Sequence, residues 1–219
     1  MNIFNKNFPN IFIEKGRLYV KTDFSNSLFD ERIVRDGNNL FREWDPKRSK
    51  LAAALMNQIS QIGFKEDSTV LYLGASHGYT PSFVSDIVAK GFVFAVEIAP
   101  IVARDLVIVC EERRNMIPIL ASANHPKDYE TVVSKVDIVY QDISQKNQVE
   151  IFLKNCDTYL KQGGFGLLAL KARSIDVTKQ PRDLYKEVKS ALEKMITVVD
   201  FRELQPFEKD HGFFIVKKR

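Results

Sequence analysis

Residues 69–86 read TVLYLGASHGYTPSFVSD, and this stretch decides the fold. Its apolar run 70–73 is typical of a strand buried on both faces, and Thr80-Pro81 pairs a cap-type residue with proline, which favours the start of a helix. Gly74 and Gly78 let the backbone approach a ligand closely, and amides at a helix start can meet an electronegative group. The stretch therefore predicts a nucleotide-binding turn, although glycine at a strand-to-helix turn also serves packing alone.

Apolar strand patterns and helical patterns alternate after this turn, which predicts a parallel sheet with helices on both faces. The expected strands are 92–96, 117–120, 136–140, 165–170, 198–204 and 212–216. The expected helices are 101–110, 145–160 and 184–195, with Gly163-Gly164 as a break before the strand 165–170. No helical pattern separates the last two strands, so we expect them to pair antiparallel.

Residues 1–47 have a different character, and we predict that they form a small β domain beside a larger domain at 48–219. Turn pairs Lys15-Gly16 and Asp36-Gly37 separate β-type runs and indicate two or more hairpins. Hairpins bury little on their own, so this segment should lean on the larger domain or on a partner. Its phenylalanines would fill that small core or form a protein-binding face, and we favour core filling; they are Phe4, Phe8, Phe12, Phe24 and Phe29.

Composition describes an ordinary globular chain of 219 residues, 45% hydrophobic and 27% charged, with a net charge of +4. That charge permits an anionic partner without requiring one. Cys110 and Cys156 form no CxxC pair and are expected to be buried thiols, and no metal site is implied. No window is apolar enough for a bilayer span and no secretory signal is visible, so we expect a cytoplasmic protein.

The ends of the expected strands should line the ligand site, because open α/β sheets bind ligands outside the carboxyl ends of their strands. Glu97 lies 23 residues beyond Gly74, where a carboxylate accepts hydrogen bonds from the ribose of a bound nucleoside. Nicotinamide dinucleotides and S-adenosylmethionine both carry that ribose. A dinucleotide turn wants a third glycine where this chain has bulk at 79–81, so the turn favours S-adenosylmethionine.

A second group of chemical residues should meet beside that donor. Asp142 and Lys171 end neighbouring strands, Lys50 lies on a helix expected to start at Asp45-Pro46, and Asp210-His211 lies at the last strand. Two lysines and a carboxylate near a sulfonium suit methyl transfer to a poorly acidic hydroxyl. A neighbouring ammonium and the sulfonium would lower the pKa of Lys171 whereas Asp142 would raise it, and the sequence leaves the balance open. Ordinary strand-end ion pairs and a structural turn histidine are the alternatives.

Several motifs, in this order and at these separations, resemble the fibrillarin family, especially its archaeal members. They are FREWDPKRSKLAAAL, VLYLGASHGYTPSFVSDI, YQDISQ, LKARSIDVT and PFEKDH. The resemblance implies a Rossmann-like class I methyltransferase sheet, mostly parallel with the last strand antiparallel, behind a small N-terminal β domain. It also implies guide-RNA-directed ribose 2′-O-methylation of rRNA, and possibly tRNA, with S-adenosyl-L-methionine. The implied partners are a Nop-type scaffold protein, a kink-turn-binding ribosomal-like protein and a box C/D guide RNA.

The family's residues carry over position by position. The catalytic group falls on Lys50, Asp142, Lys171 and His211. Together with Gly74 and Ala75 of the turn, the cofactor contacts fall on Tyr79, Thr80, Glu97, Ile98, Ser122, Ala123, Asp142, Ile143, Ser144 and Gln145. Three positions depart from the family pattern. His77 and Tyr79 replace Ser and Thr, which changes the donors near the methionine moiety, and Ser122 replaces an aspartate that accepts from adenine, so we expect weaker cofactor binding.

The leading hypothesis is therefore a guide-directed RNA methyltransferase, for which base pairing selects the site and a modest net charge suffices. Basic residues near the expected cleft would contact phosphate or simply be solvated; they are Arg48, Lys50, Arg173 and Lys179. A methyltransferase for a small molecule or protein would share the turn but have no use for the Lys50, Asp142 and Lys171 set. A non-catalytic or weakly active assembly subunit is the third possibility.

Overall fold

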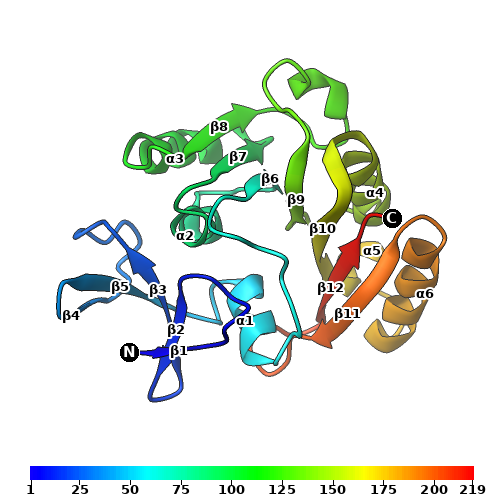
Figure 1. The fold of residues 1–219 in the computed structure, drawn as a ribbon. Helices are drawn as coiled ribbons and strands as arrows, with labels where there is room; N and C mark the ends of the chain where they lie inside the picture. The colour runs from blue at the N-terminus through cyan, green and yellow to red at the C-terminus, as the bar shows by residue number, and fades with distance from the viewer.

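Seven strands form the larger sheet of the computed structural model, which describes residues 1–219 (Figure 1). Their order is β11-β12-β10-β9-β6-β7-β8. The bounds are β6 Thr69–Leu73, β7 Phe92–Glu97, β8 Met116–Leu120, β9 Val136–Gln141, β10 Leu160–Lys171, β11 Thr197–Glu203 and β12 His211–Lys217. The five strands from β10 to β8 run parallel, whereas β12 pairs antiparallel with both β10 and β11. The α/β class and the antiparallel final pair are confirmed.

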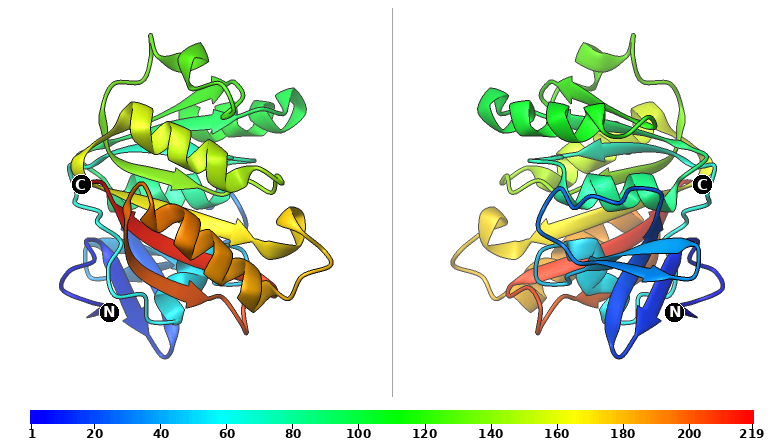
Figure 2. Two further views of the ribbon diagram at one scale, coloured as in Figure 1. Left: turned by 90° about the vertical axis from the view of Figure 1, so that its right-hand side faces the viewer. Right: turned by 90° about the vertical axis from the view of Figure 1, so that its left-hand side faces the viewer.

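Helices cover both faces of this sheet (Figure 2). They are α1 Lys50–Met56, α2 Tyr79–Ile87, α3 Pro100–Glu111, α4 Gln148–Tyr159, α5 Ala172–Ile175 and α6 Pro181–Glu193, with a short 3₁₀ turn η1 at Pro126–Tyr129. Buried residues of α1, α2 and α3 belong to one hydrophobic cluster, and those of α4, α5 and α6 belong to another. The sheet thus separates two cores, as a doubly covered parallel sheet requires.

Several helices start at other residues than the sequence predicts. Helix α4 begins at Gln148 instead of residue 145, and α6 begins at Pro181 instead of residue 184. The helix expected from Asp45-Pro46 begins at Lys50, because Ser49 is its N-cap and accepts a hydrogen bond from the amide of Ala52. This makes Lys50 the first residue of α1. The helix expected from Thr80 begins at Tyr79.

Glycines explain two further differences. Gly78, at φ 90°, is the N-cap of α2, so Thr80 lies inside the helix instead of capping it. Gly163-Gly164 was expected to precede a strand, yet β10 runs through it from Leu160, with an irregular register between Leu160 and Phe165. Gly163 and Gly164 therefore lie in an irregular, bulged part of β10 and do not interrupt the strand as the sequence predicts.

The N-terminal segment forms a second, antiparallel sheet. Its strands are β1 Asn2–Ile3, β2 Ile11–Glu14, β3 Arg17–Thr22, β4 Ile33–Asp36 and β5 Asn39–Trp44, in the order β1-β2-β3-β5-β4. Hairpins join β2 to β3 at the predicted Lys15-Gly16 turn, and β4 to β5 at residues 37–38, one position after the predicted Asp36-Gly37 pair. Phe8 and Trp44 are buried in the same cluster as α1 and α2, and Trp44 stacks on Phe83 at 5.1 Å between ring centroids. One core crosses residue 47, so the domain division there stays a prediction.

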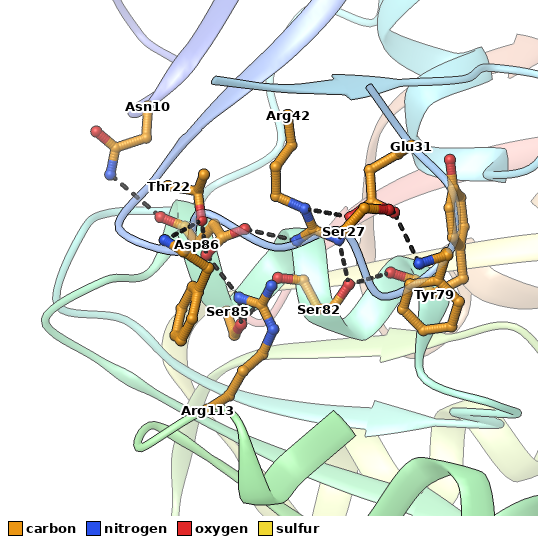
Figure 3. Close-up of polar contacts among 12 residues, drawn as sticks. Asn10, Thr22, Ser27, Glu31, Arg42, Tyr79, Ser82, Ser85, Asp86 and Arg113 are labelled. Carbon is orange, nitrogen blue, oxygen red and sulfur yellow. Dashed lines mark hydrogen bonds and ion pairs between the residues drawn. The ribbon is translucent and has the colours of Figure 1, made fainter. Parts of the chain in front are cut away.

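Buried charges lock this sheet to α2 (Figure 3). Arg42 of β5 lies 2.6 Å from a carboxylate oxygen of Glu31 and 2.6 Å from one of Asp86, which belongs to α2. Arg113, just after α3, pairs with the other oxygen of Asp86 at 2.6 Å. Ser82 of α2 accepts a further hydrogen bond from Arg42. Two cations and two anions balance, so the network is neutral, and it fixes the helix that begins at the glycine turn.

Both cysteines are buried free thiols, as predicted, and burial raises the pKa of the Cys110 thiol to about 12. None of the helices has the length and apolar character needed to cross a membrane.

Candidate active site at the carboxyl ends of the strands

The glycine turn forms a cradle between β6 and α2. Gly74 has φ +81°, and a Cβ there would collide with the carbonyl oxygen of Asp142 and crowd the side chain of Ile143. The amides of Gly74 and Ala75 both donate to the carbonyl of Val96, which ties the turn to β7. No side chain caps α2. The first amides of that helix are therefore available to an electronegative ligand group.

Glu97 ends β7 and holds the turn to the next loop. Its carboxylate accepts from the amide of Ser76 at 2.8 Å and from the amides of Ile98 and Ala99 at 2.9 Å each. Ile98 beside it exposes 55% of its surface, which is unusual for isoleucine. A carboxylate and an exposed apolar side chain therefore stand next to each other where a ribose and a base are expected.

Amide side chains join the loops that follow β8 and β9. The Asn124 side chain donates to Gln145 Oε1 at 3.0 Å and accepts from the side chain of Asn147 at 2.8 Å. Ser122 accepts from the amide of Asn124 at 3.3 Å, and buried Ala123 lies between the two. This pairing brings the predicted Ser122, Ala123 and Gln145 to one loop cluster. Ser144, one residue before Gln145, is exposed.

Two predicted contact residues turn their side chains away from the turn. The ring of Tyr79 packs edge-on against Phe29, with 5.3 Å between the two ring centroids. The guanidinium of Arg48 lies 4.2 Å from the centroid of the Tyr79 ring. The Thr80 hydroxyl donates to the Ser49 hydroxyl at 3.1 Å. At both positions the side chain packs against another element, so the ring of Tyr79 does not supply the altered side-chain donor that the sequence predicts.

His77 also faces away from the cradle. Its ring lies 3.5 Å from the carboxylate of Asp105 on α3, and both side chains are more than half exposed. The two departures from the family pattern that lie in the glycine turn, His77 and Tyr79, therefore direct their side chains to other elements.

Lys50 and Asp142 form the central ion pair of the site. Lys50 Nζ lies 3.0 Å from both carboxylate oxygens, and about one fifth of each side chain remains exposed. Burial opposes the charge of Lys50, but the charge and hydrogen bond of Asp142, aided by Glu208, outweigh it and raise the lysine pKa above its ordinary value. Lys50 therefore stays protonated.

His211 begins β12 beside this pair. Its Nδ1 lies 2.7 Å from the carbonyl oxygen of Lys209, and since a carbonyl only accepts, Nδ1 carries the proton. Burial lowers the pKa of His211 and the charge of Lys50 adds to this, against the opposing effects of the Lys209 carbonyl, Glu208 and Asp142. The ring is neutral above its lowered pKa, which leaves a lone pair on Nε2.

Lys171 ends β10 directly opposite His211 in the antiparallel register. It is exposed, and no carboxylate lies within ion-pair distance of its ammonium. Asp142 thus pairs with Lys50 and leaves Lys171 without a counter-ion.

The other basic candidates make contacts within the chain. Arg173 pairs with Asp210 at 3.2 Å, Lys179 pairs with Glu187 at 2.7 Å, and Arg48 donates to the carbonyl of Phe29 at 2.8 Å. Sequence reasoning missed Glu208, whose carboxylate lies 3.7 Å from His211 Nδ1. It also missed the buried Gln148, which contacts the backbone of Lys171. Glu208 lies inside the PFEKDH motif, which was the available signal.

The chain is similar to proteins of a known family. A family model described as fibrillarin matches residues 4–219. A fibrillarin-like rRNA/tRNA 2′-O-methyltransferase from Methanocaldococcus jannaschii is 49% identical over 189 residues, which cover 86% of this chain and 82% of that protein.

Two solved structures are also similar. A fibrillarin in complex with Nop5p has a TM-score of 0.90 and 38% identity, covering 96% of this chain and 98% of that one. A fibrillarin from Aeropyrum pernix with natively bound S-adenosyl-L-methionine has a TM-score of 0.88 and 37% identity, covering 97% and 96%.

Proposed function

The chain belongs to the fibrillarin family, and we propose that Lys50, Asp142, Lys171 and His211 carry its catalytic step. The protein is an S-adenosylmethionine-dependent 2′-O-methyltransferase of rRNA and tRNA. The observation that carries the residue assignment is the Lys50–Asp142 ion pair, which joins α1 to the end of β9 beside the glycine turn. Acidic and ammonium groups from distant segments therefore meet where the sheet opens to a ligand.

The cradle fits the cofactor. S-adenosylmethionine supplies an electrophilic methyl group when bound. Gly74 lets the turn lie directly against the backbone of Asp142, the uncapped amides of α2 suit the cofactor carboxylate, and Glu97 suits its ribose hydroxyls. The remaining proposed contacts are backbone or side-chain atoms of Ala75, Tyr79, Thr80, Ile98, Ser122, Ala123, Asp142, Ile143, Ser144 and Gln145.

The polar groups divide the work on the RNA hydroxyl. Lys50 remains an ammonium neutralised by Asp142, so the pair positions groups and does not take up a proton from the substrate. Lys171 has no carboxylate partner, and its ammonium is available to orient the ribose oxygen. Neutral His211 offers the Nε2 lone pair to the departing proton.

A Nop-type scaffold protein is the partner that the family relationship supports. We further propose a kink-turn-binding protein and a box C/D guide RNA in the same particle. A net charge of +4, and the engagement of Arg48, Arg173 and Lys179 within the chain, fit an enzyme whose substrate is held by other components. The proposed location is the cytoplasm.

Transfer of labelled methyl groups by the reconstituted particle tests the residue assignment. Asp142→Asn should abolish label in target RNA, whereas Asp137→Asn at the opposite end of β9 should leave it, because Asp137 pairs only with Lys161 and the Thr69 amide. Equal activity of the two variants would refute the assignment. Label in protein instead of RNA would favour a methyltransferase that acts on a non-RNA substrate. Absence of label with the wild-type particle would favour a non-catalytic assembly subunit.

A further inference from the structure

The backbone of Lys171 lies beyond the end of its neighbouring strand. Pairing of β10 with β9 stops at Leu168 opposite Gln141, whereas β10 continues to Lys171. On the other edge, β12 pairs with β10 as far as Lys171, and the amide of Ala172 donates to the carbonyl of Asp210. The amide and carbonyl of Lys171 face the β9 edge, where no strand remains to bind them.

The side chain of Gln148 takes the place of that strand. Its Oε1 accepts from the Lys171 amide at 3.1 Å, and its Nε2 donates to the Lys171 carbonyl at 3.2 Å. In a parallel sheet these two bonds would come from two residues of the neighbouring strand, one on each side of the residue opposite Lys171, and here one side chain makes both. The Gln148 side chain is fully buried at the start of α4, so it has no alternative partner in solvent.

Gln148 is itself held from two directions. Its Nε2 and its backbone amide both donate to the carbonyl of Gln145, at 2.9 and 3.2 Å. Its carbonyl accepts from Nε2 of Gln141 at 2.6 Å, and the Gln141 side chain is also fully buried. Gln141 immediately precedes Asp142. A continuous chain of amide hydrogen bonds therefore runs from the strand that carries Asp142 to the backbone that carries Lys171.

We propose that Gln148 is a positioning residue that fixes Lys171 relative to Asp142. This inference rests on the proposed catalytic role of Lys171. The Lys171 ammonium has no ion-pair partner, so its long side chain is constrained only by the backbone from which it projects. The Lys171 backbone needs one hydrogen-bond donor and one acceptor at the end of a single side chain, and glutamine carries both. Glutamate lacks the donor, and the asparagine side chain is one methylene too short.

Amide hydrogen exchange measured by NMR tests the clamp without any reaction. In Gln148→Met the Lys171 amide should exchange at least tenfold faster than in the wild type, whereas the Ala172 amide, bonded to Asp210, should keep its protection. Gln148→Asn keeps a polar side chain at this buried position and should give the same result, so the test survives if the methionine variant does not fold. Unchanged protection of Lys171 in the variants would overturn the proposal.

Single-turnover kinetics of the reconstituted particle test the functional consequence. Gln148→Met should lower the maximal rate at least tenfold while the concentration that gives half of that rate changes less than twofold, because alignment and not RNA binding is lost. The matched control is Asn115→Leu, which removes an amide that donates to the carbonyls of Ser85 and Val88 far from Lys171, and its rate should match the wild type. A Gln148→Met rate equal to that of the control would overturn the proposal.

The two failures are distinguishable. If Lys171→Ala retains the full rate, the catalytic role of Lys171 is wrong, yet the exchange of the Lys171 amide still reports whether Gln148 holds it. If Lys171→Ala is inactive while Gln148→Met is fully active, the catalytic role stands and the positioning role fails.

Discussion

The ammonium of Lys50 and the carboxylate of Asp142 lie 3.0 Å apart although 92 positions separate them in the chain. Lys50 occupies the first turn of α1, where a positive charge opposes the helix dipole. The charge of Asp142 offsets that cost, and Lys50 in turn neutralises the Asp142 carboxylate, of which only about one fifth is exposed. The pair is thus a tertiary contact on which the placement of both residues depends.

Lys50→Met should lower the free energy of unfolding by about 1–3 kcal/mol, because it leaves the Asp142 carboxylate without its donor. Addition of Asp142→Asn should recover part of this loss, since the stranded charge is removed. Urea denaturation measures both. Lys161→Met, which breaks the exposed Lys161–Asp137 pair, serves as the control and should cost less than ~1 kcal/mol. An equal cost for the two lysines would contradict a special role for the inner pair.

His211 should titrate below 6.5, the usual histidine value, because burial and the charge of Lys50 lower its pKa. The unfolded chain then binds the proton first as the pH falls. The stability that neutral His211 contributes is therefore complete above pH 6.5 and is lost as the pH drops through its lowered pKa. NMR of the imidazole signals, assigned with His211→Gln, measures the midpoint. In Lys50→Met the midpoint should rise; a wild-type midpoint at or above 6.5 would contradict the lowered pKa of His211.

Arg42→Met should destabilise the protein by about 3–5 kcal/mol, because it leaves Glu31 and part of Asp86 unpaired inside the network of Figure 3. Arg17→Met is the control in the same sheet. Arg17 pairs with Glu43 at the surface, so its loss should cost less than ~1 kcal/mol. Thermal denaturation compares them, and a small effect of Arg42→Met would show that the N-terminal sheet does not depend on this network.

The sheet and its chemistry were predictable from local patterns, whereas the loops between them were not. Apolar runs and alternation with helices fixed β6 to β12, because a strand buried on both faces needs a continuous apolar sequence. The predicted start of α1 is wrong by several residues. Asp45-Pro46 has the local signature of a helix start, but the helix is capped by Ser49. The Ser49 hydroxyl also accepts a hydrogen bond from Thr80 of α2, a tertiary contact that a local pattern does not reveal.

Residues of the site divide in the same way. The sequence predicts Glu97, Asp142, Lys171 and His211 as site residues because they lie at or next to strand ends, where an open α/β sheet binds ligands. Gln148 was not found, because its partner is the backbone of Lys171 and depends on β9 ending before β10. The orientation of the Tyr79 ring was also beyond local pattern, since Phe29 and Arg48 of the N-terminal segment determine it.

Ser122→Asp should tighten the binding of S-adenosylmethionine about fivefold, a gain of about 1 kcal/mol, because a carboxylate makes stronger hydrogen bonds than a hydroxyl. The aspartate side chain can keep the bond that Ser122 accepts from the Asn124 amide while it offers a second oxygen to the adenine. Isothermal titration calorimetry measures the change. Affinity equal to or weaker than that of the wild type would count against the assignment of Ser122 to the adenine end.

The central claim is that methyl transfer occurs among the side chains at the carboxyl ends of β9 and β10. The most direct test is the single-turnover rate of RNA methylation by particles carrying Lys171→Ala or Lys161→Ala, the same substitution at opposite ends of β10. We predict a loss of about 100-fold or more for Lys171→Ala, with cofactor affinity unchanged within threefold, and a wild-type rate for Lys161→Ala. Equal rates for the two variants would contradict the account.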